Sequence, residues 1–309
     1  MILQVILIAL IAVFFITVYI LYRKVFYRRE DRPENTIPSG LNGSSFMQEM
    51  LDNIEKIVEE PYEEVRTLSA DGLWLNGFYY ENVPGAPVMI SFHGYHSPPR
   101  RDSSGVFRIC RETGINLLVV EERAHGRSEG NVITFGIRER FDVLCWVRYV
   151  NETFGEETPI VLAGLSMGAA TVLMASELPM PDNVKGIEAD CAYTSPREVI
   201  GVSIRKMKLP VGLTYGLVRL GARMFGRFDP DQCTVEGALK NAKLPVLLIH
   251  GTGDEVCPYD MCRRNYDACK SEKKMLSVAG APHGVSYYYD QAGYHRVVKD
   301  FMKACGILS

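Results

Sequence analysis

The chain has 309 residues, of which 47% are hydrophobic and 23% are charged. This composition excludes a largely disordered protein and provides material for one large folded domain with an appendage. The formal net charge of -3 offers no broad electropositive field of the kind that collects on a phosphate backbone, so we expect no nucleic-acid partner.

The N-terminal segment, residues 1–22, contains no Asp, Glu, Lys or Arg. As a helix that rises 1.5 Å per residue, it would be about 33 Å long and would match a hydrocarbon core of about 30 Å. A cleaved signal peptide is the alternative, but the segment lacks a charged N-terminal region, and no small-residue cleavage site precedes Arg23. We therefore predict a transmembrane anchor over residues 1–22.

The flanking charges predict how the anchor is oriented. Only the α-amino group precedes the apolar segment, whereas several cations follow it: Arg23, Lys24, Arg28, Arg29 and Arg32. The positive-inside tendency predicts a single-pass protein of the cell membrane with its folded domain in the cytoplasm. The 8 cysteines agree with a reducing compartment, because Cys145 and Cys191 fall inside apolar patterns where a free thiol serves as a small core residue.

A juxtamembrane linker and an edge hairpin are expected next. Residues 23–45 are rich in charged residues, Pro, Gly, Asn and Ser, the composition of a linker that holds a domain away from the bilayer. The folded domain is expected over residues 46–309. Within it, residues 64–69 and 73–81 alternate apolar and polar side chains around a turn, which predicts a β-hairpin at the edge of a sheet.

Short apolar runs then predict a parallel sheet. They are typical of strands buried on both faces and lie at residues 88–92, 116–120, 160–163, 184–189 and 246–249. Helical spacing separates them, as in residues 134–154, where Thr134 is placed to cap the helix and Gly155 to end it. This alternation predicts an α/β protein with a doubly wound, mostly parallel sheet.

One long segment interrupts this alternation. Residues 196–236 are apolar and basic, and an insertion of this kind after a buried strand is expected to form a helical cap, or lid, above the carboxyl edge of the sheet. We interpret its two neighbouring acids, Asp229 and Asp231, as residues of a surface loop.

Residues 164–168 (GLSMG) have the form G-x-S-x-G. The motif alone is weak evidence for a nucleophile, because it arises by chance in about one of ten chains of this composition. However, a buried-strand pattern precedes it and a good helix former follows it, so Ser166 is expected on a sharp strand-to-helix turn. Glycine suits both ends of the motif, because side chains there would collide with the turned backbone. We predict Ser166 as a nucleophile; a glycine-rich turn with an incidental serine is the alternative.

A serine nucleophile requires a base and an acid that orients the base. His283 lies in a loop after a strand-like run, and such loops supply bases at the open edge of a sheet. His295, within a helical pattern, is the alternative. Asp254 follows the last buried strand, where a carboxylate can reach an imidazole in the neighbouring loop, and it is the predicted acid. Asp190, at the end of the preceding strand, is the alternative, interpreted as a structural aspartate.

The remaining site predictions concern backbone donors and aromatic residues. The backbone N–H groups of Tyr95 and Met167 are predicted to form an oxyanion hole. His93 and His96 resemble a metal-binding pair, but no third ligand follows at useful spacing, so we expect no metal and assign His93 a role in shaping the loop. The tyrosines at 287–289 are placed either to line an acyl or aromatic pocket or to pack in the core.

Six motifs occur in a fixed order: residues 93–95 (HGY), 122–130 (ERAHGRSEG), 164–168 (GLSMG), 190–195 (DCAYTS), 250–254 (HGTGD) and 282–284 (PHG). Together they resemble the N-terminally anchored α/β hydrolases of Gram-positive bacteria, which are related to the serine aminopeptidase (S33-like) and esterase superfamily. The likeness runs from about Val65 to Phe301. It departs at Glu122, where the family usually has Asp, and at Cys257, where it often has Val.

The resemblance implies an α/β-hydrolase fold with a cap at about 196–236, a triad of Ser166, Asp254 and His283, the two oxyanion donors, and no cofactor. We therefore expect a serine hydrolase that cleaves carboxylic esters through an acyl-enzyme. Its substrate would be a small-molecule acyl ester or a lipid-derived ester. The motifs determine neither the acyl chain length nor the oligomeric state.

Three alternative functions remain. A peptidase or amidase of the aminopeptidase-like branch would require an acidic cluster for a peptide amine, and the sequence shows none. A catalytically silent, membrane-tethered binding protein would have no use for the triad. Action on lipid-derived esters at the bilayer is suggested by the anchor and by cations of the insertion, which solvated helix faces explain equally well: Arg205, Lys206, Lys208, Arg219, Arg223 and Arg227.

Overall fold

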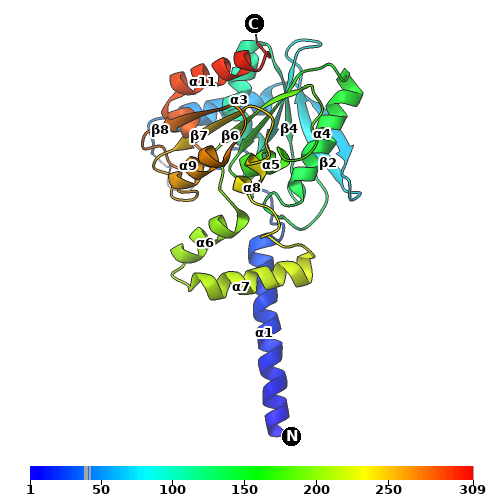
Figure 1. Ribbon diagram of the computed structural model, residues 1–309, viewed down its shortest axis with the longest axis vertical. Coiled ribbons are helices and arrows are strands. Elements are labelled where there is room, and N and C mark those ends of the chain that lie inside the picture. Colours follow the sequence, from blue (N-terminus) through cyan, green and yellow to red (C-terminus); the bar gives the residue numbers. More distant parts are fainter. Residues whose placement is uncertain (38–40, 42, 309) are drawn as a thin grey trace.

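A computed structural model describes residues 1–37, 41 and 43–308 of the chain. A long N-terminal helix, α1 (Ile2–Phe26), projects from an α/β domain (Figure 1). The described residues form one eight-stranded sheet of order β1-β2-β4-β3-β5-β6-β7-β8. Its strands are β1 (Glu63–Leu68), β2 (Trp74–Tyr80), β3 (Val88–Phe92), β4 (Asn116–Val120), β5 (Ile160–Leu165), β6 (Val184–Asp190), β7 (Val246–Gly251) and β8 (Lys273–Val278).

The pairing of the strands confirms the predicted sheet. β1 and β2 form the expected antiparallel hairpin at one edge, and all pairs from β4 to β8 are parallel. The apolar runs predicted for β3 and β4 match the observed strands residue for residue. β5, β6 and β7 each continue one or two residues further, and these extra residues lie at the carboxyl edge of the sheet, where the predicted site residues begin.

Helices cover both faces of the sheet because successive strand residues point to opposite sides. In β4, Leu118 and Val120 join one hydrophobic core, whereas Leu117 and Val119 join the other. The first core contains side chains of α4 (Glu139–Phe154), α5 (Met167–Ala175), α8 (Val235–Leu239) and α9 (Tyr259–Ala268). The second contains side chains of α2 (Met47–Glu59), α3 (Pro99–Thr113), the short α10 (Ser286–Tyr289) and α11 (Gln291–Ala304).

Helix α4 begins five residues later than expected. The prediction placed its cap at Thr134, but Phe135 and Gly136 have φ values of 55° and 88°, which a right-handed helix does not accept. Thr134 Oγ1 instead accepts the N–H of Arg138 at 2.8 Å, just before the helix starts. The end of α4 agrees with the prediction, since Gly155 follows it with a φ of 103°.

The insertion forms α6 (Pro196–Lys206), α7 (Val211–Gly221) and the π-helix η1 (Ala222–Gly226), and it ends at the start of α8. In Figure 1, α7 crosses α1 on the side of the domain from which α1 emerges. The crossing is close: a Cβ added to Gly221 would lie 2.7 Å from Tyr22 Cβ and 3.0 Å from the Val18 carbonyl oxygen. The insertion therefore packs beside the N-terminal helix.

The segment after residue 22 does not behave as the expected stand-off linker. Helix α1 continues to Phe26, and Tyr22 and Phe26 are buried in the domain. Beyond the helix, Arg28 N donates to Asn131 O at 2.9 Å, and Glu34 accepts from Arg100 Nε at 3.1 Å. The large apolar side chains of Tyr22 and Phe26, near the C-terminal end of α1, pack in the domain core, so the segment that follows lies against the domain. Residues 38–40 and 42 of the predicted linker lie outside the described residues.

We expect Phe26→Ala to lower the free energy of unfolding by about 3 to 5 kcal/mol, because it empties a buried aromatic site. The Phe26 ring meets those of Phe228 and Phe135 edge-on, with centroids 5.1 and 5.8 Å apart. Denaturant unfolding of the full-length protein in detergent measures the change. Phe15→Ala is the matched control, because that ring is 42% exposed. Equal losses in the two variants would contradict the burial of α1 in the domain.

Candidate active site

Ser166 lies at the turn between β5 and α5. Its φ of 55° and ψ of -108° are uncommon for a residue with a side chain, and its N–H donates to Asp190 O at 2.8 Å. The two glycines of the motif are required sterically. A Cβ on Gly164 would lie 2.4 Å from the Gly168 carbonyl carbon, and a Cβ on Gly168 would lie 2.1 Å from Phe92 O. The turn therefore presents the Ser166 hydroxyl at the carboxyl edge of the sheet.

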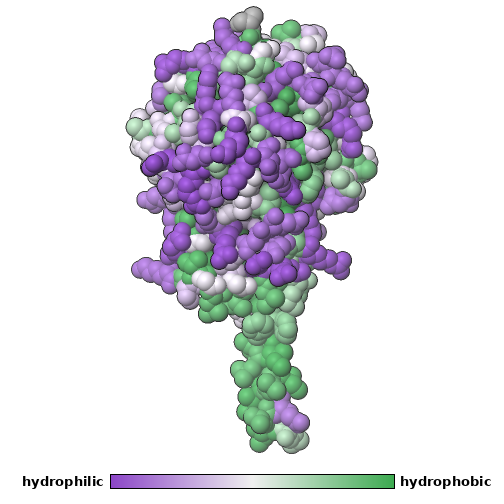
Figure 2. Space-filling view, viewed as in Figure 1, coloured by the Kyte–Doolittle hydropathy of each residue, from purple (hydrophilic) through white to green (hydrophobic). Residues whose placement is uncertain are grey.

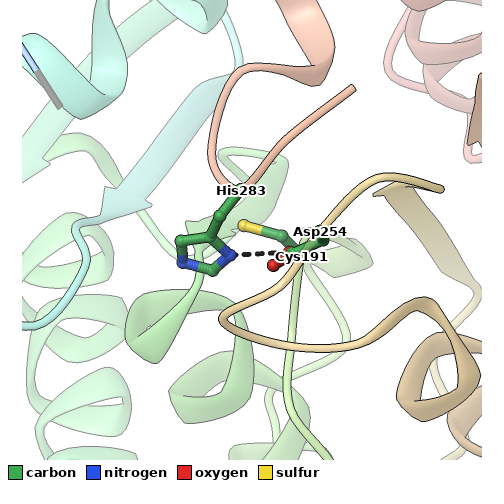
Figure 3. A group of neighbouring side chains, drawn as sticks. All are labelled: Cys191, Asp254 and His283. Atoms are coloured by element: carbon green, nitrogen blue, oxygen red, sulfur yellow. Dashed lines mark hydrogen bonds and ion pairs between the residues drawn. The ribbon is translucent and has the colours of Figure 1, made fainter. Parts of the chain in front are cut away.

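The structure brings Ser166, His283 and Asp254 into one hydrogen-bond relay. Ser166 Oγ lies 2.9 Å from His283 Nε2, and His283 Nδ1 lies 2.7 Å from Asp254 Oδ2, the contact drawn in Figure 3. The other carboxylate oxygen accepts the N–H groups of Val256 and Cys257, each at 2.8 Å. With Nδ1 donating to the carboxylate, Nε2 is left as the acceptor that faces the serine hydroxyl.

Asp254 is suited to hold an imidazolium. Burial by itself raises the pKa of this carboxyl, but hydrogen bonds with His250 and His283 outweigh burial and hold the pKa of Asp254 well below its usual value. The carboxylate is therefore ionised, and its side chain is fully buried. A fixed negative charge beside Nδ1 selects the tautomer of His283 that carries its proton on Nδ1.

The alternative base and acid lie in other hydrogen-bond networks. His295, in α11, contacts Tyr287 Oη at 3.0 Å and Glu112 Oε2 at 3.2 Å. Asp190, at the end of β6, accepts from Ser286 Oγ at 2.9 Å, and burial raises the pKa of Asp190 to about 7. Neither side chain joins the relay.

The two acids of the insertion brace the insertion itself. Asp229 accepts two hydrogen bonds from Arg219, both at 2.8 Å, and Asp231 lies 3.1 Å from Arg219 Nη1. They lie in the loop between η1 and α8, as predicted, and there they pair with a cation. The ion pairs of Arg219 with these two acids therefore tie the end of α7 to the loop that follows η1.

The two predicted oxyanion donors are the residue that follows Ser166 and a residue that lines the same cavity as Ser166. Met167 is the first residue of α5, so its N–H is one of those that a helix leaves without an internal partner. Tyr95 is in the loop after β3, and neither N–H donates a backbone hydrogen bond to another described residue. Asp102 was not foreseen: its carboxylate accepts the N–H of Gly94 at 2.8 Å and so holds this loop against Ser166.

The side chain of Tyr95 makes a second contact that no sequence pattern indicated. Its hydroxyl donates to the carbonyl oxygen of Val25 at 2.8 Å, at the last turn of α1. Its ring stacks on Phe135, with centroids 4.8 Å apart. The loop that carries one candidate oxyanion donor is thus attached to the end of the N-terminal helix.

A cavity of about 230 Å³ opens beside Ser166 and His283. Tyr287 and Tyr288 line it, as does Met50 from α2, whereas Tyr289 is exposed. No residue of 196–236 is among the described lining residues. The insertion therefore does not cover this cavity as the expected lid would, because the inner side of α7 packs beside α1 instead.

The two positions that depart from the family pattern are buried beside the site. Burial, reinforced by the neighbouring carboxylates of Glu139 and Asp142, raises the pKa of Glu122 well above its usual value. The next residue, Arg123, binds Asp142 on α4 and Asp71 in the β1–β2 turn and secures the loop. Cys257 acts through its backbone N–H, which binds Asp254. Neither substitution disturbs the relay.

The histidine pair does not converge on a common point. His93 Nε2 accepts the N–H of Glu122 at 3.0 Å, and its Nδ1 lies 2.8 Å from Gly94 O. The backbone N–H of His96 donates to His125 Nε2 at 3.1 Å. Both ring nitrogens of His93 are thus occupied, and the bond from Glu122 joins the loops after β3 and β4, which agrees with a role in shaping them.

A buried thiol lies behind the relay (Figure 3). The potential ligand atoms of Cys191, Asp254 and His283 all lie within 4.8 Å of one another. Burial raises the pKa of Cys191 well above its usual value, so it is present as a thiol, and the other two groups are already hydrogen-bonded to each other. This donor set fits a hydrogen-bonded acid and base better than a metal. All eight cysteines are free, as predicted.

Comparison with known proteins assigns the fold. No family model matches the chain. The sequence is 23% identical over 227 residues to the protein YqkD of Bacillus subtilis, which covers 68% of this chain and 74% of YqkD.

Two solved structures share the architecture. An esterase of Pyrococcus furiosus superposes with a TM-score of 0.65 at 22% identity, covering 90% of this chain and 98% of the esterase. The α/β hydrolase GrgF of Penicillium superposes with a TM-score of 0.61 at 17% identity, covering 79% and 98%. The chain therefore has the α/β-hydrolase fold.

Proposed function

We propose that this protein is a membrane-anchored serine hydrolase that cleaves carboxylic esters through an acyl-enzyme, within the serine aminopeptidase and esterase superfamily. The observation that carries the proposal is the relay from Ser166 Oγ through His283 to Asp254, located on a strand-to-helix turn. The fold shared with an esterase supports it.

The relay supports a two-step reaction. Ser166 Oγ attacks the ester carbonyl carbon while its proton passes to His283 Nε2, and Asp254 stabilises the resulting imidazolium. The N–H groups of Tyr95 and Met167 hold the negative oxygen that forms on the carbonyl. His283 then gives its proton to the departing alcohol, which leaves an acyl-serine. Water attacks this ester with His283 as the base, the acid is released, and the hydroxyl is restored.

The cavity favours an ester over a peptide substrate. Its lining includes two acids, Asp102 and Asp190, but Asp102 binds Gly94 N and Arg101, and the pKa of Asp190 is raised to about 7. Neither offers a free carboxylate for a peptide amine, so the aminopeptidase-like alternative is disfavoured. The tyrosine-lined space suits an apolar acyl group of a small-molecule or lipid-derived ester. The proposed reaction uses no cofactor and no metal.

The same proposal includes a single-pass membrane anchor. Helix α1 is the one helix among the described residues that is long and apolar enough to cross a bilayer. Tyr22 and Phe26 pack in the domain core, which favours a retained anchor over a cleaved leader. The cations that follow the apolar segment favour a cytoplasmic domain in the cell membrane.

Labelling by a fluorophosphonate tests the proposed function. The probe forms a bond between its phosphorus and an activated serine oxygen and loses fluoride. We expect the native full-length protein to be labelled and the heat-denatured protein not to be. Turnover of p-nitrophenyl esters of graded chain length then reports the acyl preference. A native protein that neither takes the label nor turns over any ester would be a silent binding protein.

A further inference from the structure

The insertion exposes an apolar face. Tyr215 and Val218 of α7 are buried on its inner side, whereas Leu213 is 67% exposed on the other. Further exposed apolar side chains precede and follow it: Met207, Leu209, Met224 and Phe225. Large exposed apolar patches on a folded domain mark an interaction site. Phe225 also contacts Tyr19 and Tyr22 of α1, but each of these side chains keeps a large exposed fraction among the described residues.

The face lies at the level where α1 would leave a bilayer. A helix needs about 20 residues at 1.5 Å each to cross a hydrocarbon core of about 30 Å. Counted from Ile2, this places the boundary near Tyr22, and α7 crosses α1 at Val18 and Tyr22. Phe225 of η1 packs on Tyr19, with ring centroids 5.1 Å apart. The insertion is therefore at the expected interface between lipid and water.

The figures show the orientation of this face. In Figure 1, α7 crosses α1 and does not run alongside it, so α7 lies across the direction in which α1 would traverse a membrane. In Figure 2, the hydrophobic surface of α1 continues onto the side of the insertion that faces the N-terminus. An amphipathic helix that binds a membrane surface lies in this way, with its apolar face toward the acyl chains.

Cations alternate with apolar residues at the turn between α6 and α7. Arg205, Lys206 and Lys208 alternate with Met207 and Leu209, and all are exposed. Lys206 pairs with Glu255 at 3.5 Å, whereas Arg205 and Lys208 form no ion pair with another described residue. Long cationic side chains of this kind reach toward lipid phosphates while neighbouring apolar groups insert, and anionic lipids strengthen the attraction.

We propose that the segment from Arg205 to Phe225, called here the interfacial segment, binds the surface of the bilayer that α1 crosses and recognises anionic headgroups. This inference rests on the membrane anchor of the proposed function and not on its chemistry. Tyr95, beside Ser166, contacts Val25 at the end of α1, so the edge of the sheet that carries the candidate nucleophile faces the same side. Binding by the interfacial segment holds that edge toward the lipid.

A fluorescent reporter on the full-length protein tests the inference. Leu213→Cys is made in a Cys305→Ser background, because the other native thiols are buried, and is labelled with a polarity-sensitive dye. The protein is reconstituted in vesicles of phosphatidylcholine with phosphatidylglycerol. We expect blue-shifted emission that is quenched by nitroxide lipids labelled near the headgroup. Lys303→Cys, exposed on α11, is the matched control and should report water.

A reporter at Ile8→Cys on α1 separates the inference from the anchor. Quenching at position 8 with water-like emission at position 213 would overturn the interfacial segment and leave the anchor in place. If nitroxide lipids quench the emission at neither position, both the anchor and the interfacial segment would be overturned. A signal at position 213 that depends on the protein-to-lipid ratio, and not on nitroxide, would show that a second copy covers this face and would also overturn the inference.

A charge-reversed variant tests the headgroup chemistry. Arg205→Glu combined with Lys208→Glu should weaken quenching at position 213 in vesicles that contain phosphatidylglycerol and leave it unchanged in phosphatidylcholine alone. Fluorophosphonate labelling should be equal to that of the parent and so report an intact fold. Equal quenching of parent and variant in both lipids would overturn the recognition of anionic lipid.

Discussion

Ser166→Ala is expected to lower kcat on a p-nitrophenyl acyl ester by about 10⁴-fold or more. The substitution removes the oxygen that lies 2.9 Å from His283 Nε2 and leaves no side-chain atom to form the acyl-enzyme. The backbone donors and the cavity remain, so binding should change little and the loss should fall on kcat rather than on KM. Steady-state kinetics of the purified full-length protein measure both.

Ser176→Ala is the matched control for this variant. Ser176 follows α5, the same helix that starts after Ser166, and its hydroxyl binds Leu173 O at 2.6 Å, outside the relay. Its kcat should equal that of the parent, and both variants should show the parent's thermal unfolding. Near-normal ester turnover by Ser166→Ala would contradict the assignment of Ser166 as the nucleophile.

Asp254→Asn is expected to lower kcat by about 10³- to 10⁴-fold with KM little changed. The N–H groups of Val256 and Cys257 bind one carboxylate oxygen and will hold the amide oxygen there. The amide NH₂ then faces His283 Nδ1 at the position of the second oxygen. Nδ1 must become an acceptor, so Nε2 carries the proton and is unable to take one from Ser166. The variant also loses the charge that stabilises the imidazolium.

Asp190→Asn distinguishes the two candidate acids. Asp190 is buried at the end of the neighbouring strand and accepts from Ser286, but it does not contact His283. Because burial raises the pKa of Asp190 to about 7, an amide resembles the protonated group that is present near neutral pH. We expect kcat within about tenfold of the parent. A greater loss for Asp190→Asn than for Asp254→Asn would assign the acid to the end of β6.

The sheet and the relay were predictable because their signals are local. A strand buried on both faces is an unbroken apolar run, so β3 and β4 were located to the residue. A serine flanked by glycines between a strand and a helix identifies the turn by steric necessity. His283 and Asp254 follow neighbouring parallel strands whose carboxyl ends share an edge, so the order of the elements was sufficient to bring them together.

Local sequence patterns did not predict the start of α4 or the role of Asp102, because backbone conformation determines the first and a contact between distant residues determines the second. The pattern for α4 extended through Phe135, but the positive φ values of Phe135 and Gly136 end the helix earlier. Asp102 is an ordinary acid in the sequence of α3 and gains its role only because the fold carries it to Gly94 N.

The sequence by itself determined an α/β fold, an apolar N-terminal helix and the turn that presents Ser166, because periodicity and steric limits act within a few residues. Only the tertiary structure determined where the C-terminal end of α1 and the insertion pack. Phe26 lies near one end of the chain, and its partners Phe135 and Phe228 lie more than a hundred residues away, so no local pattern reports their packing. That packing draws the expected linker onto the domain and places the insertion beside α1, with its apolar face exposed.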